Sequence, residues 1–192
     1  GKGSVRPGDA KYRDINEDGV VDDNDRTVIG YGQPLATGGF GTSLNFYGFD
    51  FNVFFSWSYG NDILNANRLI FETGSGQQSN KFVSYRDRWT PENPASDIPR
   101  IYANGTTVYS SRVVEDGSYL KLRNISLGYT LPKRALKKIK FDRLRIYVTA
   151  DNIATFTNYS GPDPEVSTKH SVLTPGFDWS AYPRAFGVTA GL

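Results

Sequence analysis

The sequence lacks cysteine and methionine, and His170 is its only histidine. Disulfide frameworks, thiol nucleophiles and cysteine-bound zinc or iron–sulfur sites are therefore excluded, and a histidine-rich metal site has no ligands. An excess of one charge is also lacking, because 22 Lys and Arg stand against 20 Asp and Glu, for a net charge of +2. This balance gives no electrostatic reason to expect a nucleic-acid partner.

Long apolar runs are missing as well. No stretch of about 18 consecutive apolar residues occurs, so the sequence predicts no transmembrane helix. Aromatic and turn-forming residues are plentiful, with 12 Tyr, 12 Phe, 3 Trp, 20 Gly and 10 Pro. Such a composition favours strands and turns over helices, and the expected fold class is all-β. Low mean hydropathy does not exclude a membrane protein, because the strands of a transmembrane barrel alternate lipid-facing and lumen-facing side chains.

Period-2 alternation is clearest in two neighbouring segments, 37–46 and 49–60. A turn at Gly48 joins them, so the pair predicts a β-hairpin. The segments are longer than the 5–6 residues typical of globular strands, and Trp57 and Tyr59 lie at one end, as in the aromatic girdle of a lipid-spanning strand. The apolar positions of the second segment are Phe49, Phe51, Val53, Phe55, Trp57 and Tyr59.

Three further segments alternate in the same way, at 119–131, 144–151 and 183–192. In the first of these the apolar side changes parity near Arg123, which predicts a β-bulge. About five strands of a large antiparallel transmembrane β-barrel are therefore expected. Because the smallest barrels have about eight strands, we expect the chain to be one piece of a larger barrel, with the other strands preceding residue 1.

The connections between these strands are of two kinds. Gly48 and the basic segment 132–143 form short turns, whereas residues 61–117, with a possible short helix at 63–72, and residues 154–182 form long loops. Short turns on one rim and long loops on the other are typical of outer-membrane barrels. The expected division is an extracellular loop at 1–36, followed by barrel strands and extracellular loops at 37–192.

Residues 14–25 read DINEDGVVDDND, which matches the spacing of a Ca²⁺-binding loop. Gly19 would supply the sharp turn, and Ca²⁺ needs six to eight oxygen ligands. The motif predicts one structural Ca²⁺ that stiffens a surface loop, and the alternative is a solvated acidic turn without metal. The candidate ligands are Asp14, Asn16, Asp18, the carbonyl of Val20, Asp22 and Asp25.

Motifs for catalysis are weak. Ser118 and Lys121 have the S-x-x-K spacing of acyl-transfer enzymes but begin a strand without the companion motifs. Asp163 and Glu165 form a carboxylate pair, but in a Pro-rich loop such a pair more often makes turns and caps. No catalytic residue is predicted, and the protein is not expected to be an enzyme.

Five segments occur in an order, and at separations, that resemble the C-terminal end of the SusC/RagA family of TonB-linked outer-membrane transporters of Bacteroidetes. They are DINEDGVVDDNDRTVIG, GGFGTSLNFYGFDFNVFFSWSYGNDI, RWTPENP, VEDGSYLKLRNISLGYTLP and YVTADNIATFTNYSGPDPEV. The resemblance implies a barrel of about 22 strands with an N-terminal plug, covered by a SusD-like surface lipoprotein and embedded in outer-membrane lipid. It also implies import of oligosaccharides or peptides, driven by TonB–ExbB–ExbD through an N-terminal region outside this sequence.

A second interpretation is a soluble, Ca²⁺-stabilised, β-rich carbohydrate-binding module. Six large apolar positions on one strand could equally face a second sheet inside a water-soluble sandwich. The two interpretations differ in what the apolar side of the sheet contacts. Lipid-facing side chains would lie exposed on a single sheet, whereas those of a sandwich would be enclosed.

Overall fold

The computed structural model describes residues 5–74, 79–101, 107–137, 141–168, 171 and 173–192. The chain divides into two compact units. Unit 1 comprises Gly1–Gly32, Asp62–Glu115 and Val166–Ala181, and unit 2 comprises Gln33–Asn61, Asp116–Glu165 and Tyr182–Leu192. The predicted division at residue 36 remains a prediction.

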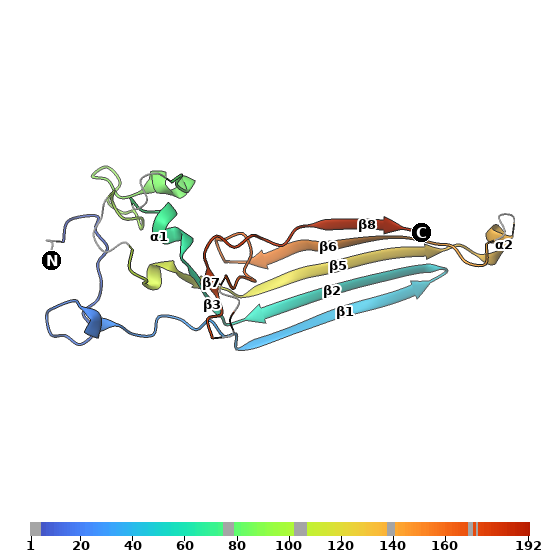
Figure 1. The fold of residues 1–192 in the computed structure, drawn as a ribbon, viewed down its shortest axis with the longest axis horizontal. Helices are drawn as coiled ribbons and strands as arrows, with labels where there is room; N and C mark the ends of the chain where they lie inside the picture. Colours follow the sequence, from blue (N-terminus) through green and yellow to red (C-terminus); the bar gives the residue numbers. More distant parts are fainter. Residues whose placement is uncertain (1–4, 75–78, 102–106, 138–140, 169–170, 172) are drawn as a thin grey trace. The chain divides into compact units, whose positions relative to one another are not determined.

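Unit 2 is built on one five-stranded antiparallel sheet with the order β1-β2-β5-β6-β8 (Figure 1). Its strands are β1 (Ala36–Phe46), β2 (Phe49–Tyr59), β5 (Tyr119–Thr130), β6 (Arg145–Thr157) and β8 (Gly187–Gly191). The predicted hairpin is confirmed, and its turn residues Tyr47 and Gly48 have φ of 47° and 87°. Positive φ at both central positions is what a two-residue type I′ turn requires. A short helix, α2 (Lys133–Leu136), lies in the β5–β6 connection.

The apolar side chains of this sheet share one face. At the short-turn end, the register aligns Phe46, Phe49, Tyr129 and Ile146 across four strands. At the opposite end, it aligns Trp57, Leu120 and Phe156. On β2 the two rows are eight residues apart, which corresponds to about 27 Å along the strand. Allowing for strand tilt, this length suits the apolar band of about 25 Å in transmembrane barrels.

This apolar face lies open. Phe40, Phe46 and Val188 remain 53%, 70% and 58% exposed. Most of the fully buried apolar side chains among the described residues belong to unit 1, where Ile63 and Val113 are completely enclosed. The sheet of unit 2 is therefore not one half of a sandwich, which argues against the soluble-module interpretation.

The bulge predicted near Arg123 is confirmed. The register shifts between Leu122 and Asn124 in the β5–β6 ladder, and between Phe54 and Phe55 in the β2–β5 ladder. Because one extra residue is inserted, Leu120 and Leu122 lie on the same face as Ile125 despite their opposite parity. The bulge also leaves Arg123 on the polar face, where it bonds Ser56.

Unit 1 contains a three-stranded sheet with the order β4-β3-β7. Its regular elements are η1 (Asp23–Asp25), β3 (Asp62–Asn65), α1 (Asn67–Phe71), η2 (Val83–Asp87), η3 (Ser111–Val113), β4 (Val114–Asp116, whose last residue falls in unit 2) and β7 (Phe177–Asp178). Glu72 follows α1 and accepts hydrogen bonds from Arg68 at 2.8 Å and Arg112 at 3.0 Å.

Three predicted boundaries were wrong. A helix was expected at 63–72, but only Asn67–Phe71 (α1) is helical, because Asp62–Asn65 forms the strand β3, which pairs in parallel with β7. The strand expected at 144–151 extends to Thr157, and the strand expected from Pro183 begins at Gly187. None of the helices in the described part of the chain combines the length and the apolar character needed to cross a bilayer.

Candidate functional site

The second face of the unit 2 sheet is polar, and its side chains bond one another across the strands. Ser43 donates to Asn52 at 2.6 Å, Asn124 to Asp151 at 2.7 Å, and Thr149 to Ser126 at 3.1 Å. Phe54 is the large apolar exception. Its ring covers Gly39 and Gly41, where added Cβ atoms would lie 2.7 and 3.1 Å from ring atoms.

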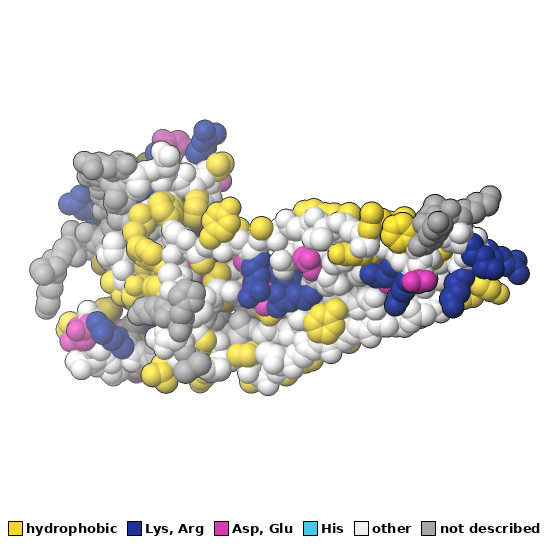
Figure 2. Space-filling view, turned by 45° about the vertical axis from the view of Figure 1, so that its right-hand side comes forward, with side chains coloured by type: hydrophobic (Ala, Val, Ile, Leu, Met, Phe, Trp, Pro, Cys, Tyr) yellow, Lys and Arg dark blue, Asp and Glu magenta, His cyan; other side chains and the backbone are white. Residues whose placement is uncertain are grey.

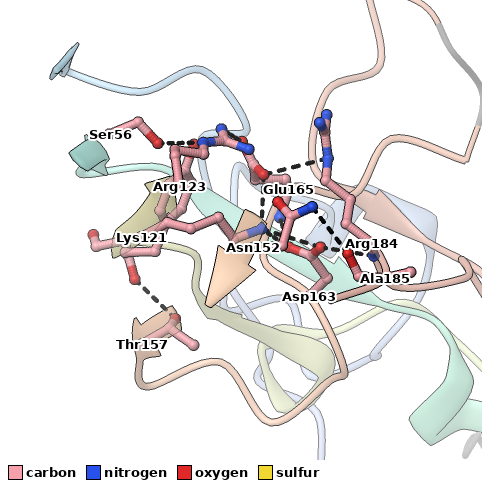
Figure 3. A network of polar contacts seen from close by, with 11 residues as sticks. Ser56, Lys121, Arg123, Asn152, Thr157, Asp163, Glu165, Arg184 and Ala185 are labelled. Atoms are coloured by element: carbon pink, nitrogen blue, oxygen red, sulfur yellow. Dashed lines mark hydrogen bonds and ion pairs between the residues drawn. The ribbon is translucent and has the colours of Figure 1, made fainter. Parts of the chain in front are cut away.

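A cluster of charged side chains, which we call the lysine cluster, joins this polar face to the loop after β6 (Figure 3). Its centre is Lys121, which is 2% exposed. Lys121 Nζ donates to both oxygens of Asp163, at 3.0 and 3.2 Å, and to Glu165 Oε2 at 2.8 Å. The cluster consists of Ser56, Tyr119, Lys121, Arg123, Asp163, Glu165 and Arg184.

Glu165 contacts more polar side chains than Asp163, the other carboxylate of the lysine cluster. The Tyr119 hydroxyl donates to it at 2.9 Å, Arg123 pairs with it, and Arg184 Nε lies 3.5 Å away. Burial alone would raise the pKa of Glu165, but the hydrogen bonds from Lys121 and Arg123 lower it to about 2. The carboxylate is therefore ionised at every physiological pH, and its three hydrogen-bond donors on β5 hold the loop against the sheet.

A second ion pair crosses the polar face near the short turns. Arg145 Nε donates to Asp50 Oδ1 at 2.9 Å, although β5 separates the strands that carry these two residues. The pair passes over Gly128, where an added Cβ would lie 2.5 Å from both Arg145 Nη2 and Asp50 Oδ1. A side chain at this position would displace the ion pair from its observed place.

Among the residues that the structure describes, these contacts leave neither of the motifs noted in the sequence arranged for covalent catalysis. Lys121 is engaged by two carboxylates, and Ser118 Oγ accepts a hydrogen bond from the backbone of Gly60 at 3.0 Å, so the S-x-x-K spacing has no catalytic geometry. Asp163 and Glu165 are both paired with cations and do not form an acid–base couple.

The acidic loop at 14–25, in unit 1, closes on itself through hydrogen bonds. Asp14 Oδ2 accepts from Gly19 N at 2.8 Å, and Asp18 Oδ1 accepts from Val20 N at 2.8 Å. Asp25 accepts from Ile15 N at 2.7 Å and from Asp22 N at 2.8 Å. These backbone bonds lower the pKa of Asp25, with the amide of Asp22 contributing most.

The residues of this loop fit a cation in part. Asp14 Oδ1 is buried and has no hydrogen-bond partner, so it is a carboxylate oxygen available for a ligand. Asp22 instead caps η1 by accepting from Asn24 N at 2.8 Å, and Asn16 Oδ1 accepts from Asp18 N at 3.1 Å. Among the residues that the structure describes, no three acidic or histidine side chains already converge on one point.

Sequence reasoning found some of these residues but not their partners. Asp163, Glu165 and Lys121 were each noticed, whereas the ion pairs between them join positions more than 40 residues apart in the sequence. The only sequence signal was alternation, which places Lys121 on the polar face between Leu120 and Leu122 without indicating its partners. His170 lies outside the described residues.

No family model matches the chain. Comparison with curated proteins finds the TonB-dependent receptor P3 of Formosa agariphila, 37% identical over 99% of this chain and 19% of that protein. The TonB-dependent receptor P26 of the same organism is 32% identical over 96% of this chain and 19% of the relative. The TonB-dependent receptor SusC of Bacteroides thetaiotaomicron is 27% identical over 97% of this chain and 18% of the relative. The chain spans about a fifth of the length of these relatives.

Solved structures agree with these relatives. The structure of the RagAB peptide transporter matches with a TM-score of 0.76 and 26% identity, over 89% of this chain and 18% of that one. The RagAB peptide importer in its open-open state matches with a TM-score of 0.70 and 28% identity, over 82% of this chain and 17% of that one. These relatives are receptors and importers rather than enzymes, in agreement with the predicted absence of catalysis. The all-β fold, the open apolar face and the relatives together show that the chain is homologous to a segment of the TonB-dependent receptors of the SusC/RagA type.

Proposed function

We propose that the protein containing this chain imports nutrients across the bacterial outer membrane and that unit 2 forms part of its barrel wall. The observation that carries the proposal is the single sheet with one exposed apolar face and one polar face. On a lipid-spanning wall, the first face would contact acyl chains and the second would line an aqueous interior. The names of the relatives support the same activity.

The cargo that we propose is an oligosaccharide or a peptide, bound with the help of a SusD-like surface lipoprotein and released by TonB-dependent energy. A peptide is what the RagAB structures are described as carrying, and SusC is named as a TonB-dependent receptor. Hydroxyl, amide and carboxylate groups on the polar face, such as Ser126, Asn124 and Asp151, are suited to hydrogen-bonding either cargo. Within unit 1, the aromatic side chains of Tyr109 and Trp179 are 55% and 43% exposed.

Substitutions at two neighbouring residues of β2 test whether unit 2 forms part of a barrel wall. Val53 lies midway between the two apolar rows, and Asn52 is the adjacent position on the polar face. In the full-length transporter, Val53→Arg would place a charge in the acyl chains and destabilise the folded barrel by about 2–4 kcal/mol. Asn52→Arg is the matched control, because it adds the same side chain on the aqueous side.

The measurement is the amount of full-length protein in purified outer membranes, together with uptake of a labelled oligosaccharide and a labelled peptide. We expect Val53→Arg to lower membrane abundance strongly and Asn52→Arg to leave abundance near the wild-type level. Equal abundance of the two variants would contradict a lipid-facing Val53 and, with it, the barrel-wall proposal. Uptake of only the labelled oligosaccharide, or of only the labelled peptide, would show which class of cargo the transporter imports.

We also propose that the 14–25 loop holds one structural Ca²⁺. Two observations support this: the matching ligand spacing and the buried, unpartnered oxygen of Asp14. The bound ion would receive oxygens from Asp14, Asp18 and Asp25 and would stiffen the loop, because each carboxylate would then be held by a charge as well as by backbone amides.

A further inference from the structure

The short-turn end of unit 2 carries a concentrated positive charge. Residues 132–145 contain seven Lys and Arg and one Asp, for a net charge of +6, whereas the whole chain carries +2. Figure 2 shows Lys and Arg side chains gathered at this end of unit 2. Charge that is concentrated so strongly at one place indicates an anionic partner there.

The cations begin directly beyond the sheet. The last bond of the β5–β6 ladder runs from Leu131 N to Leu144 O at 2.9 Å, and α2 starts at Lys133. Two residues of extended chain cover about 7 Å, which is comparable to the depth of the headgroup layer on one side of a bilayer. Lys133, Arg134 and Lys137 are exposed, and no acidic side chain among the described residues forms an ion pair with them.

Exposed apolar groups adjoin these cations. Phe46 is 70% exposed at the end of β1, and Phe49 and Ile146 lie in the same row of the apolar face. Phe141 adds a ring that is 59% exposed within the basic segment itself. Aromatic side chains followed by Lys and Arg are the arrangement found where a protein passes from acyl chains into headgroups, because long cationic side chains extend toward the polar layer.

We propose that the exposed cations Lys133, Arg134 and Lys137 form a binding surface for anionic phospholipid headgroups of the leaflet at the short-turn rim. The proposal rests on the proposed function, since it requires the apolar face of unit 2 to lie in a bilayer. Continuity with that apolar face favours lipid over an acidic protein segment, which would not need exposed Phe46 and Phe141 beside it. Lys133, Arg134 and Lys137 would contact phosphate oxygens, and each cation contributes about a fivefold preference for an anionic surface.

The test uses the full-length transporter reconstituted in phosphatidylcholine vesicles that contain spin-labelled phosphatidylglycerol or spin-labelled phosphatidylcholine. The fraction of each label that is immobilised by the protein gives the lipid preference. We expect the wild type to prefer phosphatidylglycerol by about fivefold or more, and the preference to fall as salt is added. The triple variant Lys133→Gln, Arg134→Gln, Lys137→Gln should lose most of this preference.

A charge-matched control replaces three exposed cations of unit 1, as Lys11→Gln, Arg13→Gln, Arg86→Gln. The control should keep the wild-type preference, because its charges are not at the short-turn rim. Equal immobilisation of the two lipids by the wild type, or the same loss in both triple variants, would overturn the proposal. Preference for an added acidic peptide over phosphatidylglycerol would overturn it as well. Failure of the wild type to insert into vesicles would instead count against the proposed function.

Discussion

Glu165 links three parts of unit 2 through one carboxylate. Its donors come from β5, through Tyr119, Lys121 and Arg123, and from the segment before β8, through Arg184. Burying Lys121 without partners would be costly, and Asp163 and Glu165 together offset that cost. The Asp163–Glu165 loop is therefore held on the polar face by charge and not by apolar packing.

This arrangement predicts a specific response to acid. The pKa of Glu165 in the folded protein is about 2, below its ordinary value, so its contribution to stability is complete above about pH 4.5. The contribution is lost progressively as the pH falls from there toward 2. Glu165→Gln should lower the stability of the folded protein at neutral pH. It should also make stability depend less on pH between about 4.5 and 2.

The measurement is the urea midpoint of the full-length protein in detergent at a series of pH values. Glu92→Gln is the matched control, because Glu92 is an exposed carboxylate in unit 1. The control should follow the wild-type curve throughout. An unchanged acid dependence in Glu165→Gln would show that other carboxylates dominate this window.

At the scale of elements, the 14–25 loop is ordered by its own backbone amides. Asp25 lies at the end of η1 and accepts from amides at both ends of the loop, which brings residue 15 beside residue 25. Such a closed loop has already lost much of its conformational freedom, so binding of an ion would require little further ordering.

Calorimetric titration of Ca²⁺ into the full-length protein tests this loop. We expect one site in the range of extracellular modules, with a Kd of about 10⁻⁴–10⁻³ M, and weaker binding of Mg²⁺. Asp25→Asn should weaken the affinity for Ca²⁺ by about tenfold or more, because mutating even a residue that only supports a metal ligand has an effect of this size. Asp97→Asn, an exposed carboxylate elsewhere in unit 1, should not change it. Absence of a heat signal in the wild type would contradict the proposal that the 14–25 loop binds Ca²⁺.

Elements were predictable where a local rule determined them. The hairpin followed from alternation on both sides of Gly48, and the bulge followed from the change of parity at Arg123. Segment 62–65 was predicted incorrectly because its partner, Phe177–Asp178, is more than 100 residues away and is itself only two residues long. No local pattern can indicate such a pairing.

For the whole molecule, the open apolar face predicts how the 192-residue chain behaves alone. Its five-stranded sheet ends in two strands, β1 and β8, that each have one neighbour among the described strands. Unpaired edges and exposed aromatic rings promote association. In water we expect aggregation of the isolated chain, and in detergent we expect a dispersed particle.

Light scattering coupled to size-exclusion chromatography measures this difference. A folded, monodisperse monomer in detergent-free buffer would contradict the lipid-facing assignment and favour the soluble-module interpretation.

The residues that form the apolar face were predictable from the sequence, because alternation determines on which side of a strand each side chain lies. The lysine cluster was not predictable, because the contacts of Lys121 depend on how the loop after β6 folds back.

The ion pair between Asp50 and Arg145 has a consequence for assembly of the sheet. Because it bridges β2 and β6 over Gly128 of β5, it forms only if two ladders are aligned correctly at once. A slip by one residue in either ladder would present Leu127 or Tyr129 in place of the glycine and turn one charge toward the opposite face. The ion pair thus stabilises only the correct register of all three strands, and misaligned intermediates would lack it.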